Sequence, residues 1–250
     1  MSSTYRKWGY TKMAAKNDIS EYMLKKQRTA TKQNKSKVLI VDDHPIVREG
    51  LVALIDRQGD LKVCGQADDA YDALKSIDKL KPGVVIVDIP LKGSNGIELT
   101  KSIRAQYPAL PVIVFSVHDE SVYAERALRA GARAYLTKKA ASEKIIKAIR
   151  AVLSGELYVS DELSKKLLQK IIGDKAGKIS TPVDDFSDRE FEVFRLIGQG
   201  YRASEAAKQL HLSAKTVETY RERIKRKLGL DDSSELLRYA IKWSGSREME

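Results

Sequence analysis

Short apolar runs alternate with segments of helical period between residues 37 and 158. Runs rich in Val and Ile, without interleaved polar residues, are typical of strands buried on both faces of a parallel sheet. Between these runs, apolar residues recur every three or four positions, which predicts helices. The predicted strands are 38–41, 61–64, 84–87, 111–116 and 134–136, and the predicted helices are 46–55, 69–80, 96–106, 120–130 and 142–153. This alternation predicts an α/β fold, a doubly wound five-stranded parallel sheet with helices on both faces.

The pattern changes after this first domain. Ser160 is a suitable N-cap for a helix that reaches Ile172, and residues 173–182 lack apolar periodicity, which is typical of a linker. We therefore place a linker with one helix at 159–184, between the α/β domain and a second domain at 185–250.

The second domain is predicted to be small and all-helical. A capping box at 187–190 opens its first helix, and the glycines at 198 and 200 end it. A helix at 202–210, a tight turn at 211–213 and a longer basic helix at 214–228 follow, with Ser213 as N-cap, and a last helix runs from about 233 to 243. Helix, short turn and longer helix form a helix-turn-helix, whose second helix lies in a DNA major groove.

The net charge of +11 is unevenly distributed over the 250 residues. The first 36 residues hold nine Lys/Arg against two acidic residues, so most of the excess lies in an N-terminal extension. This favours an appendage attracted to polyanions over a uniformly basic protein. Two other interpretations are open, a solvated disordered extension and a start codon placed too early, with Met13 or Met23 as the first residue.

The hydrophobic runs are short, and cysteine is rare. The longest apolar run, 110–117, is far shorter than the roughly 20 residues of a membrane span, and the N-terminus has no apolar signal core. We expect a cytoplasmic protein without a membrane partner. Cys64 is the only cysteine, which excludes a disulfide framework and a cysteine-rich zinc site.

Chemically active side chains follow the predicted strands at their carboxyl ends, which meet at one edge of a parallel sheet. Three carboxylates gathered there would repel one another and need a hard divalent cation, for which Mg²⁺ is the natural choice. A metal beside a carboxylate nucleophile neutralises an incoming phosphoryl group, while a hydroxyl and an ammonium group bind its oxygens. The residues at these ends are Asp42, Asp43, Asp88, Ser116 and Lys138.

Residues 37–158 closely resemble the receiver domain of bacterial two-component signalling. The resemblance rests on Val-Asp-Asp-His-Pro (41–45), Val-Asp-Ile (87–89), Asn-Gly-Ile-Glu-Leu (95–99), Phe-Ser-Val-His-Asp (115–119) and Gly-Ala-Arg-Ala-Tyr-Leu-Thr-Lys (131–138). It implies that Asp88 is the phosphoacceptor and that Ser116 and Lys138 bind the phosphoryl group. It also implies a switch formed by Ser116 and Tyr135. The implied Mg²⁺ ligands are Asp42, partly through water, Asp43, Asp88 and the backbone carbonyl of Pro90.

The chain departs from the receiver pattern near Asp88. Lys92 stands where the family usually has a proline, so we expect the loop at 92–96 to be looser than usual. Pro90 and His118 occupy positions that flank the phosphoryl group in the family, which leaves the lifetime of the phosphorylated state open. His118 is expected either to titrate near neutral pH or to be a solvated loop histidine.

The second domain resembles the LuxR-type DNA-binding domain, and the whole chain resembles a NarL/FixJ-type response regulator. The matching motifs are Phe-Ser-Asp-Arg-Glu (186–190), Gly200, Leu-Ser-Ala-Lys-Thr-Val-Glu-Thr-Tyr (212–220) and Lys-Leu-Gly-Leu (227–230). The resemblance implies that Glu218, Thr219 and Glu222 face base edges and that Ser213, Lys215, Thr216, Tyr220 and Arg223 lie nearer the phosphates. Val217 is more suited to packing. The two glutamates depart from a basic face, since they accept from cytosine but repel phosphates, so we expect low non-specific affinity.

These observations predict a phosphorylation-controlled transcription factor. We expect a sensor histidine kinase, double-stranded DNA and, after phosphorylation, a second copy of the chain as partners, with contact to RNA polymerase left open. We expect no enzymatic activity beyond Mg²⁺-dependent phosphorylation and dephosphorylation of Asp88. Two alternatives are a phosphatase, although Pro90 stands where such enzymes have a second acid, and a protein-binding or dimerising output without promoter recognition.

Overall fold

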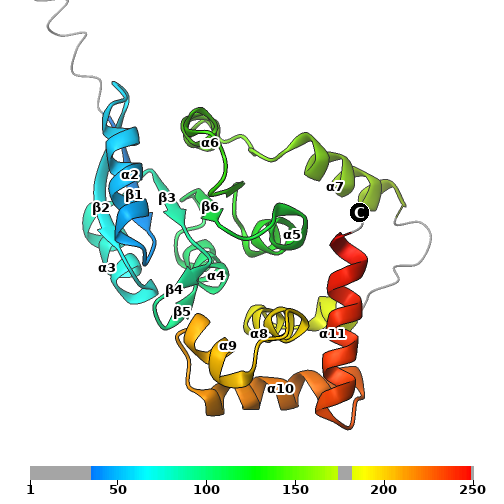
Figure 1. The fold of residues 1–250 in the computed structure, drawn as a ribbon. Helices are drawn as coiled ribbons and strands as arrows, with labels where there is room; N and C mark the ends of the chain where they lie inside the picture. Colours follow the sequence, from blue (N-terminus) through cyan, green and yellow to red (C-terminus); the bar gives the residue numbers. More distant parts are fainter. Residues whose placement is uncertain (1–34, 174–181, 249–250) are drawn as a thin grey trace, which may run out of the picture. The chain divides into compact units, whose positions relative to one another are not determined.

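The computed structural model describes residues 35–173 and 182–248 (Figure 1). Almost all of the predicted N-terminal extension, 1–36, and the central part of the predicted linker lie outside the described residues. No helix within the two described ranges is long and apolar enough to cross a membrane.

Five parallel strands form the central sheet, in the order β2-β1-β3-β6-β7. The fold predicted from the sequence, a flavodoxin-like doubly wound sheet, has this order and is confirmed. The strands are β1 (Ser36–Val41), β2 (Leu61–Ala67), β3 (Val84–Val87), β6 (Val112–Ser116) and β7 (Ala134–Thr137).

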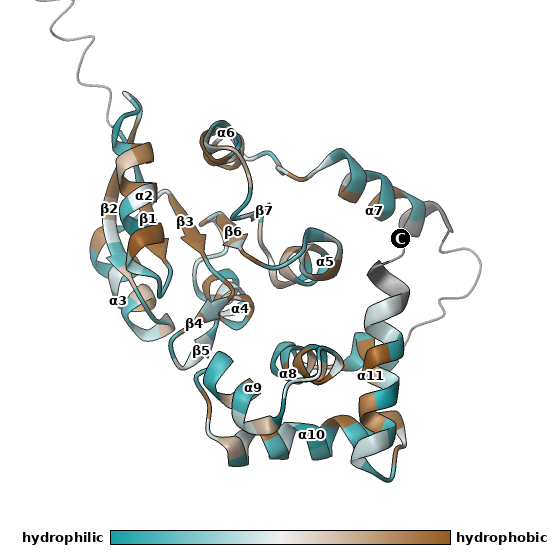
Figure 2. Cartoon of the chain, viewed as in Figure 1, coloured by the Kyte–Doolittle hydropathy of each residue, from teal (hydrophilic) through white to brown (hydrophobic). Residues whose placement is uncertain are grey.

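Helices cover the sheet on both faces, because successive residues of each strand point to opposite sides. In β1, Val38 and Ile40 pack in one apolar cluster with α2 and α6, whereas Leu39 and Val41 pack in another with α3 and α4. Figure 2 shows β3, whose sequence is Val-Val-Ile-Val, in the colour of hydrophobic residues. The helices are α2 (Pro45–Asp56), α3 (Ala70–Leu80), α4 (Gly96–Gln106), α5 (Glu120–Ala130) and α6 (Ser142–Leu153).

Two features of the α/β domain differ from the prediction. Strand β2 continues to Ala67, because residues 65–67 pair with the end of β1 beyond a register shift at Val38/Leu39. The loop at 92–96 contains β5 (Ser94–Asn95), which pairs with β4 (Pro90–Leu91) in an antiparallel hairpin that the sequence did not predict. Gly93 lies between these strands with a φ of 65°, a conformation that glycine adopts without the strain of a side chain.

The remaining described elements are helical. Ser187 forms the predicted capping box and Ser213 the predicted N-cap. Pro182, assigned to the linker, begins a 3₁₀ helix, and the last helix reaches Glu248, beyond the expected end near residue 243. The elements are α7 (Asp161–Gly173), η1 (Pro182–Asp185), α8 (Asp188–Gly198), α9 (Ala203–Gln209), α10 (Ala214–Leu228) and α11 (Ser233–Glu248).

Aromatic residues hold the helices of the second domain together. Phe194 packs edge-on against Phe186 and Trp243, with ring centroids 5.2 and 5.5 Å apart. Leu236 and Ala240 of α11 are fully buried in the same cluster. This core fixes α10 through Val217 and Ile224, and so positions the second helix of the helix-turn-helix.

Candidate phosphoacceptor site and DNA-binding face

Asp88 directly follows β3 and is almost completely buried, with 1% of its surface exposed. Its backbone N–H donates to Val41 O at 2.9 Å, and its Oδ1 accepts from the N–H of Ile89 at 2.7 Å. The second oxygen, Oδ2, is therefore the one turned to the other polar groups at this edge of the sheet.

Lys138 provides the cation for this buried carboxylate. Its Nζ lies 2.6 Å from Asp88 Oδ2 and 2.7 Å from Asp42 Oδ2. Burial raises the pKa of Asp88 to about 6, and the charge of Lys138 partly opposes that rise. Burial also disfavours the charged Lys138, but the two carboxylates outweigh it and raise its pKa. The ammonium group is thus held charged where an anion would bind.

Ser116 ends β6 beside this pair and is fully buried. Its hydroxyl has no hydrogen-bond partner of good geometry among the described residues, although it lies close enough to Asp88 to lower the pKa of that carboxyl. A buried hydroxyl that is not committed elsewhere is suited to donate to a phosphoryl oxygen.

The acidic group predicted from the strand ends is present. One ligand atom from each of Asp42, Asp43, His44 and Asp88 lies within 4.8 Å of every other, an arrangement that could hold a metal ion. These carboxylates fit a hard divalent cation, which prefers oxygen ligands. Pro90 lies two residues after Asp88, in β4, and the predicted role of its carbonyl stays a prediction.

Tyr135, the predicted switch residue, is buried, and its hydroxyl donates to the backbone carbonyl of His118 at 3.0 Å. His118 is not the solvated loop histidine that the sequence suggested. Its ring stacks on Tyr123, with centroids 4.5 Å apart. Burial, aided by the charges of Arg195 and Lys138, lowers the pKa of His118 to about 3, so it does not titrate near neutral pH.

Helix α8 is tied to α4 and α5 by polar contacts that the sequence did not predict. The carboxylate of Asp188 is buried and forms two ion pairs. Its Oδ2 lies 2.7 Å from Lys101 Nζ, and its Oδ1 lies 3.4 Å from Arg126 Nη1. Arg126 also donates to the backbone carbonyls of η1 and the residue after it, at 2.8 and 2.9 Å. The Nε of Arg195 donates to the hydroxyl of Tyr123 at 3.0 Å. No sequence pattern in a single chain marks these pairs, since their members lie 57 to 87 positions apart.

The predicted DNA contacts lie along one side of α10. Val217 is fully buried, which confirms its assignment to packing. Thr216 and Tyr220 are half-buried. The other predicted contacts are exposed: Ser213, Lys215, Glu218, Thr219, Glu222 and Arg223.

Several of these side chains are already paired within α10. The hydroxyl of Ser213 accepts from the N–H of Thr216 at 3.0 Å, and the hydroxyl of Thr219 donates to the carbonyl of Lys215 at 3.0 Å. Glu218 pairs with Arg221 at 3.1 Å and Glu222 with Lys225 at 2.9 Å. The neighbouring cations reduce the repulsion that the two glutamates would exert on DNA phosphates.

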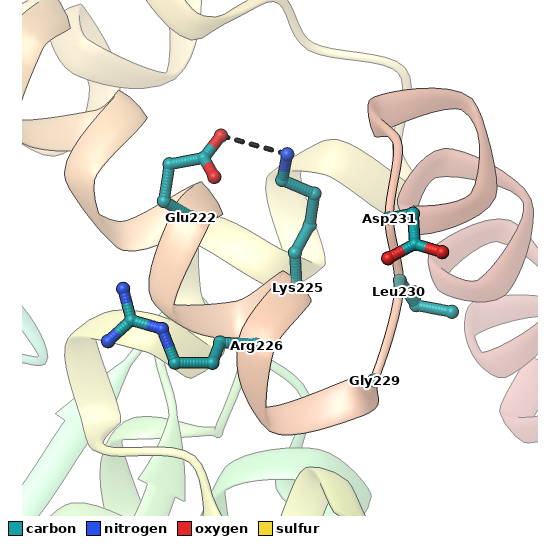
Figure 3. Close-up of a pocket in the computed structure, with 6 residues that line it drawn as sticks. All are labelled: Glu222, Lys225, Arg226, Gly229, Leu230 and Asp231. Carbon is teal, nitrogen blue, oxygen red and sulfur yellow. Dashed lines mark ion pairs between the residues drawn. The ribbon is translucent and has the colours of Figure 1, made fainter.

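A shallow hollow lies at the carboxyl end of α10 (Figure 3). Figure 3 shows Glu222 and Lys225 turned toward each other on one turn of the helix, with Asp231 on the segment after Gly229. Four of its six lining residues are charged, so it is a polar part of this helix rather than a site for an apolar ligand. None of the predicted phosphoryl-binding residues lines it.

Fold and site together define a class: a five-stranded α/β domain with a buried carboxylate, ammonium and hydroxyl at one sheet edge, followed by a helix-turn-helix domain. Residues 38–150 match the response regulator receiver domain, and residues 184–240 match the bacterial regulatory proteins of the luxR family. The chain belongs to the NarL/FixJ-type response regulators, which carry a receiver and a LuxR-type DNA-binding domain.

Known relatives span nearly the whole described chain. The response regulator GacA of Pseudomonas aeruginosa is 36% identical over 206 residues, covering 82% of this chain and 95% of the relative. The oxygen regulatory protein NreC of Staphylococcus aureus is 34% identical over 210 residues, covering 82% and 97%.

Solved structures of RcsB from Salmonella are similar in fold. One, described as showing conformational dynamism for DNA interaction, has a TM-score of 0.58 at 28% identity and covers 84% of this chain and 98% of that one. Another, RcsB bound to the promoter rprA with the phosphomimetic BeF₃⁻, has a TM-score of 0.54 at 29% identity and covers 83% and 98%. The chain is thus a response regulator with a DNA-binding domain that regulates transcription.

Proposed function

We propose that phosphoryl transfer from a sensor histidine kinase to Asp88 controls promoter binding by α10. The observation that carries this proposal is the pairing of Asp88 Oδ2 with Lys138 Nζ at 2.6 Å, beside a buried, unpartnered hydroxyl and two further carboxylates. This pair places the carboxylate nucleophile of Asp88 next to the ammonium group of Lys138, which can bind the incoming phosphoryl anion.

In the proposed reaction, an oxygen of Asp88 attacks the phosphorus of a phosphohistidine. The bond between phosphorus and the imidazole nitrogen breaks, its electron pair stays on that nitrogen, and a phosphorus–oxygen bond forms on Asp88. Lys138 then pairs with a phosphoryl oxygen, and Ser116 donates a hydrogen bond to another. Apart from this reaction and the hydrolysis of the aspartyl phosphate, which releases inorganic phosphate and restores the carboxylate of Asp88, we propose no enzymatic activity.

We propose Mg²⁺ as the cofactor, held by Asp42, Asp43, Asp88 and the backbone carbonyl of Pro90. When bound, it supplies positive charge that lets the anion approach. The support for it is the group of carboxylates at this edge of the sheet, since Asp42 and Asp88 are buried and the ammonium group of Lys138 faces both of them. One lysine does not balance three carboxylates, so a divalent cation fits the charge that remains.

Control of DNA binding is proposed to run through α5 and α8. Tyr135 binds the carbonyl of His118, His118 stacks on Tyr123, and Tyr123 accepts a hydrogen bond from Arg195 of α8. Six of the eight predicted DNA contacts are exposed, so the receiver does not act here by covering the reading face. This favours control of dimer formation, with a homodimer as the phosphorylated form.

The proposed phosphoryl transfer is tested by labelling with a small acyl phosphate. We expect the full chain to take up one phosphoryl group in Mg²⁺ and none after chelation. Asp88→Asn should take up none, whereas Asp78→Asn, an exposed carboxylate of α3, should label like the wild type. Label that persists in Asp88→Asn would contradict the proposal.

The DNA-binding part is tested by binding-site selection from random duplexes, followed by affinity measurements. We expect fragment 180–250 to bind the selected site without phosphorylation, and the full chain to bind it more tightly once phosphorylated. A tenfold gain corresponds to about 1.4 kcal/mol. If the wild type, Asp88→Ala and the phosphorylated protein bind the selected site with the same affinity, the proposal is wrong. The alternative, a dimerising output without promoter control, would then be favoured.

We also propose a division into an extension at 1–36, a receiver at 37–158, a linker at 159–184 and a DNA-binding domain at 185–250, acting in the cytoplasm. If the basic extension contacts DNA, its removal flattens the salt dependence of binding. If it is only solvated, the salt dependence does not change.

A further inference from the structure

His44 contacts two carboxylates of the acidic group, whereas His211 contacts one. Its Nδ1 lies 2.7 Å from Asp43 Oδ1 and 3.2 Å from Asp42 Oδ1, and its backbone N–H donates to Asp42 Oδ1 at 2.8 Å. His44 is the N-cap residue of α2, yet its side chain makes no capping bond, and Pro45 follows it. The imidazole is therefore held by the carboxylates rather than by the helix.

Two carboxylates of the acidic group are buried, whereas the imidazole of His44 is accessible to solvent. Asp42 and Asp88 are 2% and 1% exposed, so their oxygens are withdrawn from water, whereas 61% of the His44 side chain is exposed. The unpartnered hydroxyl of Ser116, itself fully buried, lies beside the same carboxylates. An ion can thus reach the imidazole from solvent and the carboxylates behind it.

We propose that His44 is a direct ligand, through Nδ1, for a borderline transition-metal ion such as Zn²⁺, in a shell shared with Asp42, Asp43 and Asp88. This extends the metal site of the proposed function, but it changes the ion. Mg²⁺ takes oxygen ligands and gains little from an imidazole, whereas imidazole is a preferred ligand of Zn²⁺. One histidine among carboxylates therefore shifts the preference of the site toward Zn²⁺.

The consequence for phosphorylation follows from ligand number. Zn²⁺ in proteins is usually four-coordinate, and three carboxylates with one imidazole complete that number. No position is then left for a phosphoryl oxygen. Mg²⁺ is six-coordinate and keeps exchangeable waters, one of which a phosphoryl oxygen can replace. Zn²⁺ is thus an antagonist of phosphorylation at Asp88.

The three histidines of the chain make this testable without ambiguity. His211 lies 3.3 Å from Asp43 Oδ2 and is the rival ligand, while His118 is stacked on Tyr123. Untagged full-length protein labelled with ¹⁵N in its histidines is titrated with Zn²⁺ near neutral pH, and the ring nitrogens are followed by NMR. Resonances are assigned with His44→Gln, His118→Gln and His211→Gln.

We expect Zn²⁺ to move Nδ1 of His44 to the metal-bound range and to leave His118 and His211 in place. In competition with a chromogenic chelator, His44→Gln should lower the ratio of Zn²⁺ to Mg²⁺ affinity about tenfold or more, the lower end of the effect of losing an outer-shell partner. His118→Gln and His211→Gln should keep the wild-type ratio. Circular dichroism shows whether each variant is folded, and His44→Asn serves if His44→Gln is not.

A metal-bound shift at His211 in place of His44 overturns the proposal, and so does a titration in which no ring nitrogen moves. Neither readout requires phosphoryl transfer. If Asp88 takes up no phosphate but His44 binds Zn²⁺, the proposed function fails and this inference stands. If Asp88 is phosphorylated and His44 does not move, the reverse holds.

Discussion

Replacing His118 by glutamine should change how the stability of the protein depends on pH. The fold lowers the pKa of His118 to about 3, chiefly by burial. In the unfolded chain a histidine has a pKa of about 6.5, so below that pH the unfolded state takes up a proton that the folded state refuses. The stability associated with neutral His118 is therefore complete above about pH 6.5 and is lost as the pH falls toward 3.

The size of the effect follows from these two values. Between pH 7 and pH 5, protonation of the unfolded chain lowers the free energy of unfolding by at most about 2 kcal/mol. His118 is only partly buried, so solvent screening reduces this to roughly 1 kcal/mol. His118→Gln removes the proton-binding group, and the loss of stability between these pH values should shrink by that amount.

Urea unfolding of the full chain at pH 7, 6 and 5, followed by circular dichroism, measures this difference. Val117→Ala is the matched control, because Val117 is an exposed neighbour in the same loop and carries no titratable group. Its pH dependence should equal that of the wild type. A wild-type pH dependence in His118→Gln, or an equal flattening in Val117→Ala, would refute the argument.

Three further outcomes are expected. A methyl group on Gly96 would overlap the backbone carbonyl of the phosphoacceptor, so Gly96→Ala should cost about 2 kcal/mol or more in urea unfolding, whereas Gly50→Ala, with no atom nearby, should be neutral or stabilising. Tyr123→Phe removes the acceptor for a charged donor of α8, worth about 1.5 kcal/mol, and should raise the DNA affinity of the unphosphorylated chain about tenfold in an anisotropy assay. Leu237 and Ile241 are 39% and 51% exposed on α11, and replacing both by serine should keep the phosphorylated protein monomeric in sedimentation at micromolar concentration. Unchanged dimers would exclude this surface.

The carboxyl ends of the strands could be predicted from the sequence because a parallel sheet imposes a simple pattern. Runs such as 84–87 are buried on both faces, so they are uniformly apolar and stop where the chain becomes polar. The polar residues that follow must then lie at one edge. The pattern therefore predicts that Asp88, Ser116 and Lys138 lie together. In the structure, Lys138 Nζ is 2.6 Å from Asp88 Oδ2, and Ser116 is close enough to lower the pKa of Asp88.

The contacts of α8 could not be predicted in this way. Asp188 stands in the first turn of a helix, where an acidic residue is expected for the helix dipole alone. Its partners lie 62 and 87 positions earlier in the chain, on helices whose exposed faces carry several cations. The burial of His118 could not be predicted for a related reason, since its loop is polar in sequence and the ring that stacks on it belongs to Tyr123 of the following helix.

The ion pairs of Asp188 limit the ways in which the proposed phosphorylation of Asp88 can affect α8. Asp188 is 5% exposed in its side chain and is paired with Lys101 and Arg126, so removing either cation would leave a buried charge poorly compensated. Phosphorylation changes neither residue. In the proposed reaction it acts on Lys138, which would exchange an ion pair with Asp88 for one with a phosphoryl oxygen, and on Ser116. In the proposed function, the route to α8 runs from Tyr135 through His118 and Tyr123 to Arg195. A shift along it can change DNA binding only by the difference in free energy between the two arrangements of these side chains, so the hydrogen bond from Arg195 to Tyr123 sets the scale of the response.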